Sequence, residues 1–321
     1  MKKKILIIGS NFALNYHFKI INQLYRKSEI HVVSPNLDNK KLNKNIVQHK
    51  DLNKVLKEKK FFLILCCATP IVQTKFIKYI YTNKIKSKKI LLEKPVSLDL
   101  KILKKFLVYS KKNNINVAVN FTYSNLKIFK KIKNIIKNTS NDHHLNFSLK
   151  FMHPFFIKKN KSWKNFISEG GGIINYYINH ILFSFTKIFG KLEIKSFKVM
   201  TSNKNEIKKF TLNLLNKKIK INIYINLYSK KYIHEHMLYY KGNKKIFLTK
   251  RKNWYLDYEY YENNKKQEIY KENIFNLIKL NYGYLNIKNS EKSEYLNKIY
   301  INEILCQKLN KKLMKYDFKK M

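Results

Sequence analysis

Apolar runs alternate with helix-spaced patterns over the first 120 residues of the chain. The apolar runs are short, continuous and rich in Ile, Leu and Val, which is typical of strands buried on both faces. They lie at 3–9, 29–35, 61–70, 88–95 and 115–123. Apolar side chains recur at helical spacing between them, at 12–27, 51–60, 71–84 and 97–114. This order predicts a doubly wound parallel sheet with helices on both faces.

The pattern changes after about residue 121. Apolar and polar side chains now alternate along several segments, which predicts strands with one wetter face. These segments lie at 143–152, 191–200, 208–215, 218–228, 234–241 and 244–250, and Lys-Gly-Asn at 241–243 suits a tight turn. Helical spacing returns at 126–138, 172–190 and 291–316. We therefore expect an α/β protein, with a Rossmann-type doubly wound parallel sheet at 1–120 and an α+β domain with a mainly antiparallel open sheet at 121–321.

The net charge of +47 at first suggests a nucleic-acid partner. Of the 67 cationic residues, however, only Arg26 and Arg251 are arginines, although arginine is the better reader of phosphate and guanine. Asn is also abundant, with 40 residues, and Lys, Asn, Ile, Tyr and Phe all have A/T-rich codons. The charge forms no separate stripe or arm, so we attribute it to genome bias on solvated faces and expect no specific nucleic-acid binding.

The cysteines and the start of the chain indicate a compartment. Cys66, Cys67 and Cys306 cannot form a disulfide framework, and the first two lie within an apolar run, so we expect buried thiols in a reducing environment. The opening MKKKILIIGS is too short in apolar residues for a signal peptide, and no apolar stretch reaches about 18 residues. We expect a cytoplasmic protein that does not span a membrane.

Glycine placement is the first indication of chemistry. Gly9 is the sole glycine among the first 169 residues, and it follows the first strand where a helix begins. A dinucleotide-binding fold needs a tight turn there, with the amides of the helix N-terminus facing a pyrophosphate. The fingerprint G-x-G-x-x-G is incomplete, since Asn11 and Leu14 occupy its second and third glycine positions. A simple strand-to-helix turn is the alternative.

The second strand ends at Ser34, where an acid would bind the ribose hydroxyls of NAD. A hydroxyl with Lys40 and Lys41 shortly after it suits a 2′-phosphate better than a carboxylate would. The sequence therefore favours NADP over NAD.

Two further strand ends carry polar residues. Ala68-Thr69-Pro70 ends one strand, and Glu93-Lys94-Pro95 ends the next. Proline removes a hydrogen-bond donor and stops the ladder, so Glu93 and Lys94 should lie at an exposed strand end. Ligands bind at the carboxyl ends of the strands in open parallel sheets.

These spacings together resemble the Gfo/Idh/MocA family of glucose-fructose oxidoreductases and inositol dehydrogenases. The resemblance rests on His17 eight residues after Gly9, on the motifs at 68–70 and 93–95, and on Glu-Gly-Gly-Gly at 169–172 with His180. It spans nearly the whole chain and implies transfer of a hydride between NAD or NADP and a hydroxyl or keto group of a sugar, cyclitol or nucleotide-sugar.

The resemblance also implies roles for individual residues. Lys94 would bind the reacting hydroxyl and help move its proton, and His180 would be the catalytic histidine. Tyr176 stands where much of the family has an aspartate, four residues before that histidine, and we include it among the catalytic candidates. The residues assigned to the cofactor are Gly9, Ser10, Asn11, Phe12, Ala13, Ser34, Ala68, Thr69, Pro70, Glu93, Lys94 and Asn120. Those assigned to the substrate are Tyr123, Trp163, Asn175 and Asn179.

Other interpretations stay open. Lys94 could be one surface lysine among many, and His180 a buried histidine with a structural role. A catalytically silent nucleotide- or sugar-binding protein on the same scaffold is the alternative to an enzyme. His234-Glu235-His236 would place two imidazoles on one strand face, but no third ligand is evident, so no metal site is expected. A homo-oligomer could form through the C-terminal sheet.

Overall fold

A computed structural model describes residues 2–34, 46–58, 60–137, 143–152, 163–167, 169–201, 207–216, 219–240, 244–250 and 257–315. The chain forms two compact units. Unit 1 comprises Met1–Thr122, Ser168–Gly171 and Phe275–Gln307, and unit 2 comprises Tyr123–Ile167, Gly172–Ile274 and Lys308–Met321. Unit 1 thus contains the N-terminal segment that the sequence assigns to the first domain, together with two later segments.

Unit 1 is built on a six-stranded parallel sheet in the order β3-β2-β1-β4-β5-β6. Its strands are β1 (Lys4–Ile8), β2 (Glu29–Val33), β3 (Ile46–His49), β4 (Phe61–Cys66), β5 (Ser87–Leu92) and β6 (Asn116–Val119). The central strand β1 pairs with both β2 and β4, so that Ile5 lies opposite Ile30 on one side and Leu63 on the other. Ile5 and Leu63 are fully buried, as expected for a parallel sheet covered on both faces.

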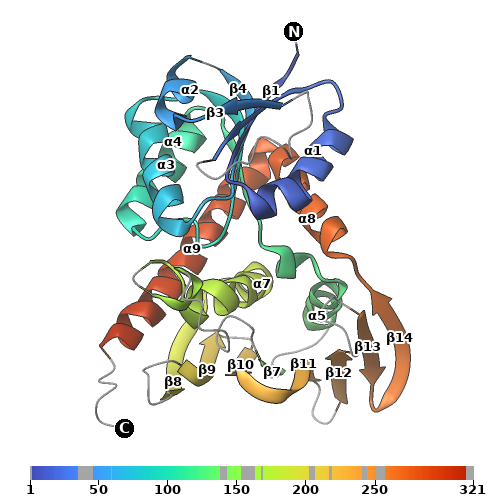
Figure 1. Cartoon of the computed structure of the whole chain (residues 1–321). Coiled ribbons are helices and arrows are strands. Elements are labelled where there is room, and N and C mark those ends of the chain that lie inside the picture. The colour runs from blue at the N-terminus through green and yellow to red at the C-terminus, as the bar shows by residue number, and fades with distance from the viewer. Residues whose placement is uncertain are drawn as a thin grey trace. The chain divides into compact units, whose positions relative to one another are not determined.

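Helices cover the two faces of this sheet (Figure 1). They are α1 (Phe18–Leu24), α2 (Leu52–Glu58), α3 (Pro70–Thr82), α4 (Leu100–Lys112), α8 (Ile274–Gly283) and the first part of α9 (Asn289–Met314). In Figure 1, α3 and α4 lie together on one face, and α1 and α8 lie on the other. Asp99 starts α4 as an N-cap, since its carboxylate accepts hydrogen bonds from the backbone N–H groups of Lys101 and Ile102.

Unit 2 is built on an eight-stranded sheet in the order β14-β13-β12-β11-β7-β10-β9-β8. Its strands are β7 (His143–Met152), β8 (Glu193–Thr201), β9 (Ile207–Asn216), β10 (Ile219–Asn226), β11 (Tyr228–Tyr240), β12 (Lys244–Lys250), β13 (Asp257–Glu262) and β14 (Lys265–Lys271). β10 and β7 pair in parallel, and the other neighbours pair antiparallel. The α/β fold class and the mainly antiparallel second sheet are therefore confirmed.

Helices α5 (Lys127–Lys137) and α7 (Asn179–Phe189) pack on one face of this sheet (Figure 1). The ring of Phe185 in α7 lies 5.8 Å from that of Phe129 in α5 and 6.5 Å from that of Phe147 in β7. All three rings are buried, so they join the helical layer to the sheet. Glu272 caps α5, because its Oε1 accepts a hydrogen bond from the N–H of Lys127 at 2.9 Å.

Two single turns of π-helix interrupt the helical segments. The turn η1 (Ala13–His17) precedes α1, and η5 (Ile174–Ile178) precedes α7. Short 3₁₀ turns also occur, at η3 (Thr122–Asn125), η4 (Trp163–Asn165) and η6 (Tyr284–Asn286). Single π-turns are rare and occur often at functional sites. Here one ends at His17 and the other ends two residues before His180.

Some elements escaped the sequence patterns. The strands β3, β13 and β14 and the helix α8 were not predicted. β3 is four residues long and not fully buried, while β14, Lys-Lys-Gln-Glu-Ile-Tyr-Lys, is largely polar, so neither carries a strong apolar pattern. The predicted turn at 241–243 lies outside the described residues. No helix in the described ranges is long and apolar enough to cross a membrane.

The turn after β1 requires glycine. Gly9 has φ +121°, and an added Cβ would lie 2.6 Å from the carbonyl oxygen of Cys67. A side chain would therefore be strained by its own backbone and would also push against the backbone that follows β4.

We predict that Gly9→Ala lowers the free energy of unfolding by about 2 kcal/mol or more, because both the backbone strain and the contact with Cys67 oppose it. Urea unfolding followed by circular dichroism measures the loss. Gly283→Ala is the matched control, since an added Cβ there meets nothing within 4 Å. Equal stability of the two variants would contradict the role assigned to the Gly9 turn.

Candidate functional site

The polar strand ends of unit 1 lie at one level along the carboxyl edge of the sheet. Backbone hydrogen bonds carry the ladder one residue beyond the strands: Gly9 N–H to Val33 O at 2.9 Å, Cys67 N–H to Ile8 O at 2.8 Å, Glu93 N–H to Cys66 O at 3.2 Å and Asn120 N–H to Leu92 O at 2.8 Å. The residues that follow each strand are therefore neighbours across the edge. This places Gly9, Cys67, Glu93 and Asn120 side by side.

Gln73 holds the loop that carries Lys94. The Gln73 amide nitrogen donates hydrogen bonds to the carbonyl oxygens of Glu93 at 2.6 Å, Pro95 at 2.9 Å and Val96 at 3.2 Å. Its amide oxygen accepts from the Glu93 N–H at 2.9 Å. Gln73 is 1% exposed, so these partners have little access to water. One side chain of α3 thus fixes the backbone on both sides of Lys94.

The far end of the same loop is held by α9. The Glu303 carboxylate accepts a hydrogen bond from the N–H of Val96 at 3.2 Å, and both residues are buried. Burial and the charge of Glu303 raise the pKa of the neighbouring Cys306 thiol, while the positive charge of Lys94 acts in the opposite direction. Lys94 itself is half-buried. The loop is therefore rigidly placed, and its lysine is not a freely solvated surface group.

The Glu93 carboxylate is the centre of a buried polar network. Its Oε1 accepts a hydrogen bond from the Asn120 amide at 2.7 Å, lies 3.4 Å from His17 Nε2 and accepts from the Cys67 thiol at 4.0 Å. The other ring nitrogen of His17 forms a 2.8 Å hydrogen bond with the Tyr282 hydroxyl. His17 is completely buried, so both of its nitrogens are used inside the protein.

The network continues away from Glu93. The Asn120 amide oxygen accepts from the Asn281 amide at 2.7 Å and from the Thr122 hydroxyl at 3.1 Å. Burial, with the Glu93 charge nearby, raises the pKa of the Cys67 thiol and of the Tyr282 hydroxyl well above their ordinary values. Both groups are therefore neutral hydrogen-bonding groups near pH 7.

The loop after β1 leaves helix amides at the carboxyl edge. The first helical hydrogen bond runs from Leu14 N–H to Ser10 O at 2.8 Å, so the N–H groups of residues 11–13 precede it. Ser10 is half-buried, Asn11 and Phe12 are exposed, and Ala13 is buried. Such amides with a glycine turn fit an anionic group such as a pyrophosphate.

The remaining residues assigned to the cofactor lie beside this loop or at the next strand end. Ser34 is 7% exposed directly after β2, while Lys40 and Lys41 lie outside the described residues. Ala68 and Thr69 are half-buried, and Pro70 begins α3 as its first residue.

Gly170 of the Glu-Gly-Gly-Gly motif packs against the motif at 68–70 and against Leu98. Gly170 has φ +84°, and an added Cβ would lie 2.5 Å from Pro70 Cβ and 2.8 Å from Leu98 Cδ2. Only glycine fits this close approach. Residues some 100 positions apart in the sequence thus pack together within unit 1.

The substrate and histidine candidates belong to unit 2. The ring of Tyr123 lies 5.5 Å from that of His180, and the ring of Tyr176 lies 4.8 Å from that of Tyr177. Lys164 Nζ lies over the Tyr176 ring at 5.3 Å, and burial lowers the pKa of Lys164. These groups come from three different segments of unit 2, which the tertiary structure assembles around η5.

The asparagine candidates are more deeply placed. Asn175 is 4% exposed, and its amide oxygen accepts a hydrogen bond from Asn310 at 2.9 Å, while Asn179 is fully buried. Trp163 is half-buried in η4. Tyr176 and His180 are also half-buried, so they form the more accessible side of this helical segment.

Lys94 belongs to unit 1 and His180 to unit 2, and each has a defined local setting. Their joint action on one substrate stays a prediction. The structure describes the backbone of His234 and His236 in β11 but not their side chains.

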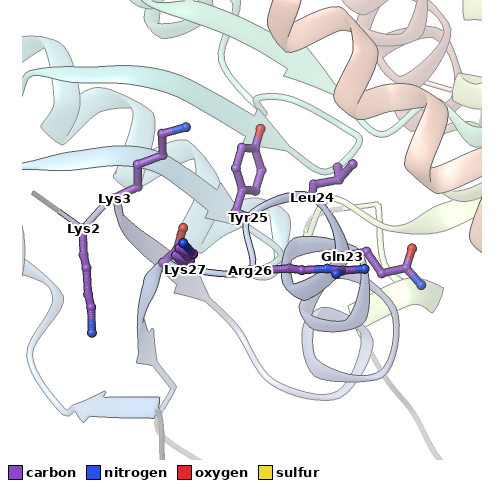
Figure 2. A pocket seen from close by; sticks show the side chains of 8 residues that line it. Lys2, Lys3, Gln23, Leu24, Tyr25, Arg26 and Lys27 are labelled. Carbon is purple, nitrogen blue, oxygen red and sulfur yellow. The ribbon is translucent and has the colours of Figure 1, made fainter.

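A separate hollow lies before β1 and β2, at the amino-terminal edge of the sheet (Figure 2). Figure 2 shows Tyr25 and Lys3 extending to the same side, with Lys2 extending away from them. Lys3 and Lys89 both lie over the Phe62 ring, at 4.7 and 4.9 Å, and burial together with the charge of Lys3 lowers the pKa of Lys89. This surface is cationic, but it lies at the opposite strand ends from the motifs.

Comparison with known proteins assigns the fold. No protein-family model matches the chain, and no curated protein is detectably similar to it in sequence. Solved structures nevertheless match over nearly its full length. An oxidoreductase from Thermotoga maritima is 16% identical with a TM-score of 0.76, and the match covers 96% of this chain and 95% of that one.

Two further structures show the range of proteins on this fold. KijD10, a 3-ketoreductase from Actinomadura kijaniata in complex with NADP and TDP-benzene, has a TM-score of 0.75 at 10% identity, covering 95% of this chain and 96% of that one. A super-repressor mutant of Gal80p from Saccharomyces cerevisiae has a TM-score of 0.77 at 11% identity, covering 98% and 96%. The chain therefore has the fold of the Gfo/Idh/MocA-type oxidoreductases, as the motifs predicted.

Sequence reasoning missed several residues of the unit 1 network. Cys67 was interpreted as core, and Gln73, Asn281, Tyr282 and Glu303 were not singled out. The apolar spacing of Leu277, Ile278 and Tyr282 could have revealed α8. No local signal, however, identifies the hydrogen-bond partners of Asn281 and Tyr282, which lie more than 150 residues away in the sequence.

We predict that Gln73→Leu destabilises the protein by about 3 kcal/mol, because it leaves several buried backbone groups of the 93–96 loop without a partner. Urea unfolding measures the change. Gln307→Leu is the control: Gln307 is half-buried and donates one 3.4 Å hydrogen bond to Ser97 O, so its loss should cost under about 1 kcal/mol. If Gln73→Leu were as stable as Gln307→Leu, the proposal that Gln73 holds the 93–96 loop would be refuted.

Proposed function

We propose that the protein is an NAD(P)-dependent oxidoreductase that transfers a hydride between the nicotinamide and a hydroxyl or keto carbon of a sugar, cyclitol or nucleotide-sugar. One observation carries the proposal: the Gly9 turn and the Glu93-Lys94-Pro95 loop lie at the same carboxyl edge of a parallel sheet, and Gln73 and Glu303 hold that loop in place. Ligands of open α/β sheets bind at this edge.

The cofactor would be held by the Gly9 turn and the helix amides that follow it. Its pyrophosphate fits the N–H groups of residues 11–13, and its ribose fits the end of β2 at Ser34. When bound, NAD(P) supplies the carbon that gives or accepts the hydride. Glu93 is turned inward to His17 and Asn120, so we assign it to holding the edge rather than to proton transfer.

Lys94 is the residue that acts on the substrate oxygen. Its ammonium would donate a hydrogen bond to that oxygen and carry the proton that leaves or joins it as the hydride moves. Because Gln73 fixes the peptide groups on both sides of Lys94, its position at the edge is preorganised.

The assignment of His180 and Tyr176 rests on the sequence resemblance. Tyr176 cannot replace a carboxylate as a base near pH 7, since a tyrosine titrates near 10. The neighbouring Tyr177 is held further from ionisation, because burial raises its pKa. His180 would therefore be the second acid–base group, and Tyr176 a hydrogen-bonding group of the substrate site.

The aromatic surroundings of His180 support a sugar-type substrate. Tyr123 and Tyr176 present half-buried rings within unit 2, and Trp163 lies in the same unit. Aromatic faces with adjacent polar groups suit ligands that have both apolar and hydroxylated surfaces. The ketoreductase that shares this fold was solved with TDP-benzene and NADP, which agrees with NADP as the cofactor and with a nucleotide-sugar as the substrate.

We predict that the protein binds NADPH and reduces a member of a keto-sugar panel, and that Lys94→Ala lowers kcat by about 10² to 10⁴-fold. Binding is measured by calorimetry, and turnover by loss of NADPH absorbance. Lys101→Ala, an exposed lysine of α4, is the control and should leave turnover unchanged. Normal turnover of Lys94→Ala would disprove the mechanism even if the cofactor binds.

We predict that Ser34→Asp shifts cofactor preference from NADPH to NADH, because a carboxylate at the end of β2 repels a 2′-phosphate and accepts hydrogen bonds from a free ribose. The Kd for NADPH should rise by at least about tenfold, which corresponds to 1.4 kcal/mol. Ser10→Asp is the control, because its charge near the pyrophosphate should weaken the binding of both cofactors. If Ser34→Asp weakened the binding of NADPH and NADH equally, Ser34 would have no role in discriminating between them.

A catalytically silent binding protein is the second candidate. The match to a super-repressor form of Gal80p and the tyrosine at position 176 favour it. The two candidates differ in one measurement: the silent protein binds NADPH or a nucleotide-sugar but oxidises or reduces nothing in the panel, with or without Lys94.

A further inference from the structure

Three side chains of metal-ligating type converge in unit 1. His17 ends the π-turn before α1, Cys67 follows β4, and Glu93 follows β5. One ligand atom from each lies within 4.8 Å of the other two. They are an imidazole nitrogen, a sulfur and a carboxylate oxygen, the three ligand types that zinc uses in proteins.

Two of the three separations are close to those of a tetrahedral site, and the third, between His17 and Cys67, is within 4.8 Å. Zinc binds nitrogen and oxygen at about 2.0–2.2 Å and sulfur at about 2.3 Å, which puts neighbouring ligand atoms about 3.3–3.6 Å apart. His17 Nε2 and Glu93 Oε1 are already 3.4 Å apart. Cys67 Sγ and Glu93 Oε1 are 4.0 Å apart, so a shift of about half an ångström brings them into range.

The groups behind the triad would orient these ligands. His17 Nδ1 is bonded to the Tyr282 hydroxyl at 2.8 Å. In the tautomer whose Nδ1 donates to that hydroxyl, Nε2 presents its lone pair to the other two ligands. Asn120 donates to Glu93 Oε1 at 2.7 Å and is itself held by Asn281. Partners of this kind fix the tautomer of a ligating histidine and the rotation of a ligating carboxylate.

One side of the triad is accessible. His17 is fully buried, but the Glu93 side chain is 19% exposed and Cys67 is half-buried. A cation can therefore reach the three atoms from the carboxyl edge, and the fourth coordination position would face that edge, where a water molecule can occupy it.

We propose that His17, Cys67 and Glu93 form a binding site for one Zn²⁺ or a similar divalent transition metal. Sulfur and imidazole ligands select zinc-like ions over Mg²⁺ and Ca²⁺, which prefer oxygen. Binding deprotonates the Cys67 thiol, and the released proton passes to solvent. The site does not depend on the proposed oxidoreductase function, although Glu93 belongs to both.

The test uses tag-free full-length protein without cofactor and titrates it with Co²⁺, which reports thiolate ligation by a charge-transfer absorption. We expect that absorption to saturate at one Co²⁺ per chain and to be displaced by Zn²⁺ but not by Mg²⁺. Cys67→Ala should abolish it, whereas Cys66→Ala, which removes the buried neighbouring thiol, should retain it.

Variants of the other proposed ligand residues and of their hydrogen-bond partners test the site further. Glu93→Gln should weaken Co²⁺ binding, and Tyr282→Phe should lower the affinity by about 10-fold without changing the stoichiometry. Cys67→Ser is the substitute if Cys67→Ala does not fold, as judged by circular dichroism of the metal-free variants. A wild-type protein without the thiolate absorption, or a Cys67 variant that keeps it, overturns the proposal.

A competition experiment separates this site from the proposed function. If NADPH binds as proposed, saturating Zn²⁺ should raise its apparent Kd, because Glu93 and its loop belong to the cofactor edge. If NADPH does not bind at all, the oxidoreductase proposal fails while the Co²⁺ titration still decides the metal site.

Discussion

The hydrogen bonds of the half-buried Glu93 carboxylate are the interactions on which unit 1 depends. Glu93 follows the last residue of β5, and its carboxylate contacts three residues that come after other strands in the sequence. These are His17 after β1, Cys67 after β4 and Asn120 after β6. The Glu93 backbone is fixed in turn by Gln73. A carboxylate with several partners in a low-dielectric setting is strongly held, and removing the carboxylate would leave those partners without their shared acceptor. The carboxyl ends of four adjacent strands are therefore linked by side chains as well as by the backbone ladder.

The hydrogen bonds around the 93–96 loop distinguish Lys94 from the other lysines of the chain. The chain has 65 lysines among its 67 cationic residues, so charge and residue type alone say nothing about function. Lys94 differs because its loop is held by Gln73 from α3 and by Glu303 from α9, and because it stands at the strand ends where open sheets bind ligands. The cationic hollow around Lys3 and Tyr25 is a useful contrast. This hollow carries more positive charge than the surroundings of Lys94, but it lies at the amino ends of the strands, where ligands of open sheets do not usually bind.

Prediction from the sequence succeeded where a signal was local. Continuous apolar runs identified β1, β4 and β5, and glycine or proline next to those runs identified Gly9 and the Glu93-Lys94-Pro95 loop as strand ends. Prediction failed where the signal was weak or distant. β14 is too polar to stand out, and Gln73 looks like any helical glutamine until its amide is seen against the 93–96 backbone. The motif at 169–172 could be recognised, but its reason, the close approach of Gly170 to Pro70 and Leu98, required the fold.

By itself the sequence determined the order of the elements, the two kinds of sheet and the positions where strands stop, because hydrophobic periodicity and backbone restrictions act within a few residues. Only the tertiary structure decided which side chains meet. His17, Cys67, Glu93 and Tyr282 are separated by as many as 265 positions, and their convergence follows from strand order and helix packing, which bring remote residues to one sheet edge. The same physical reason explains why a thiol interpreted as core lies within reach of an imidazole and a carboxylate.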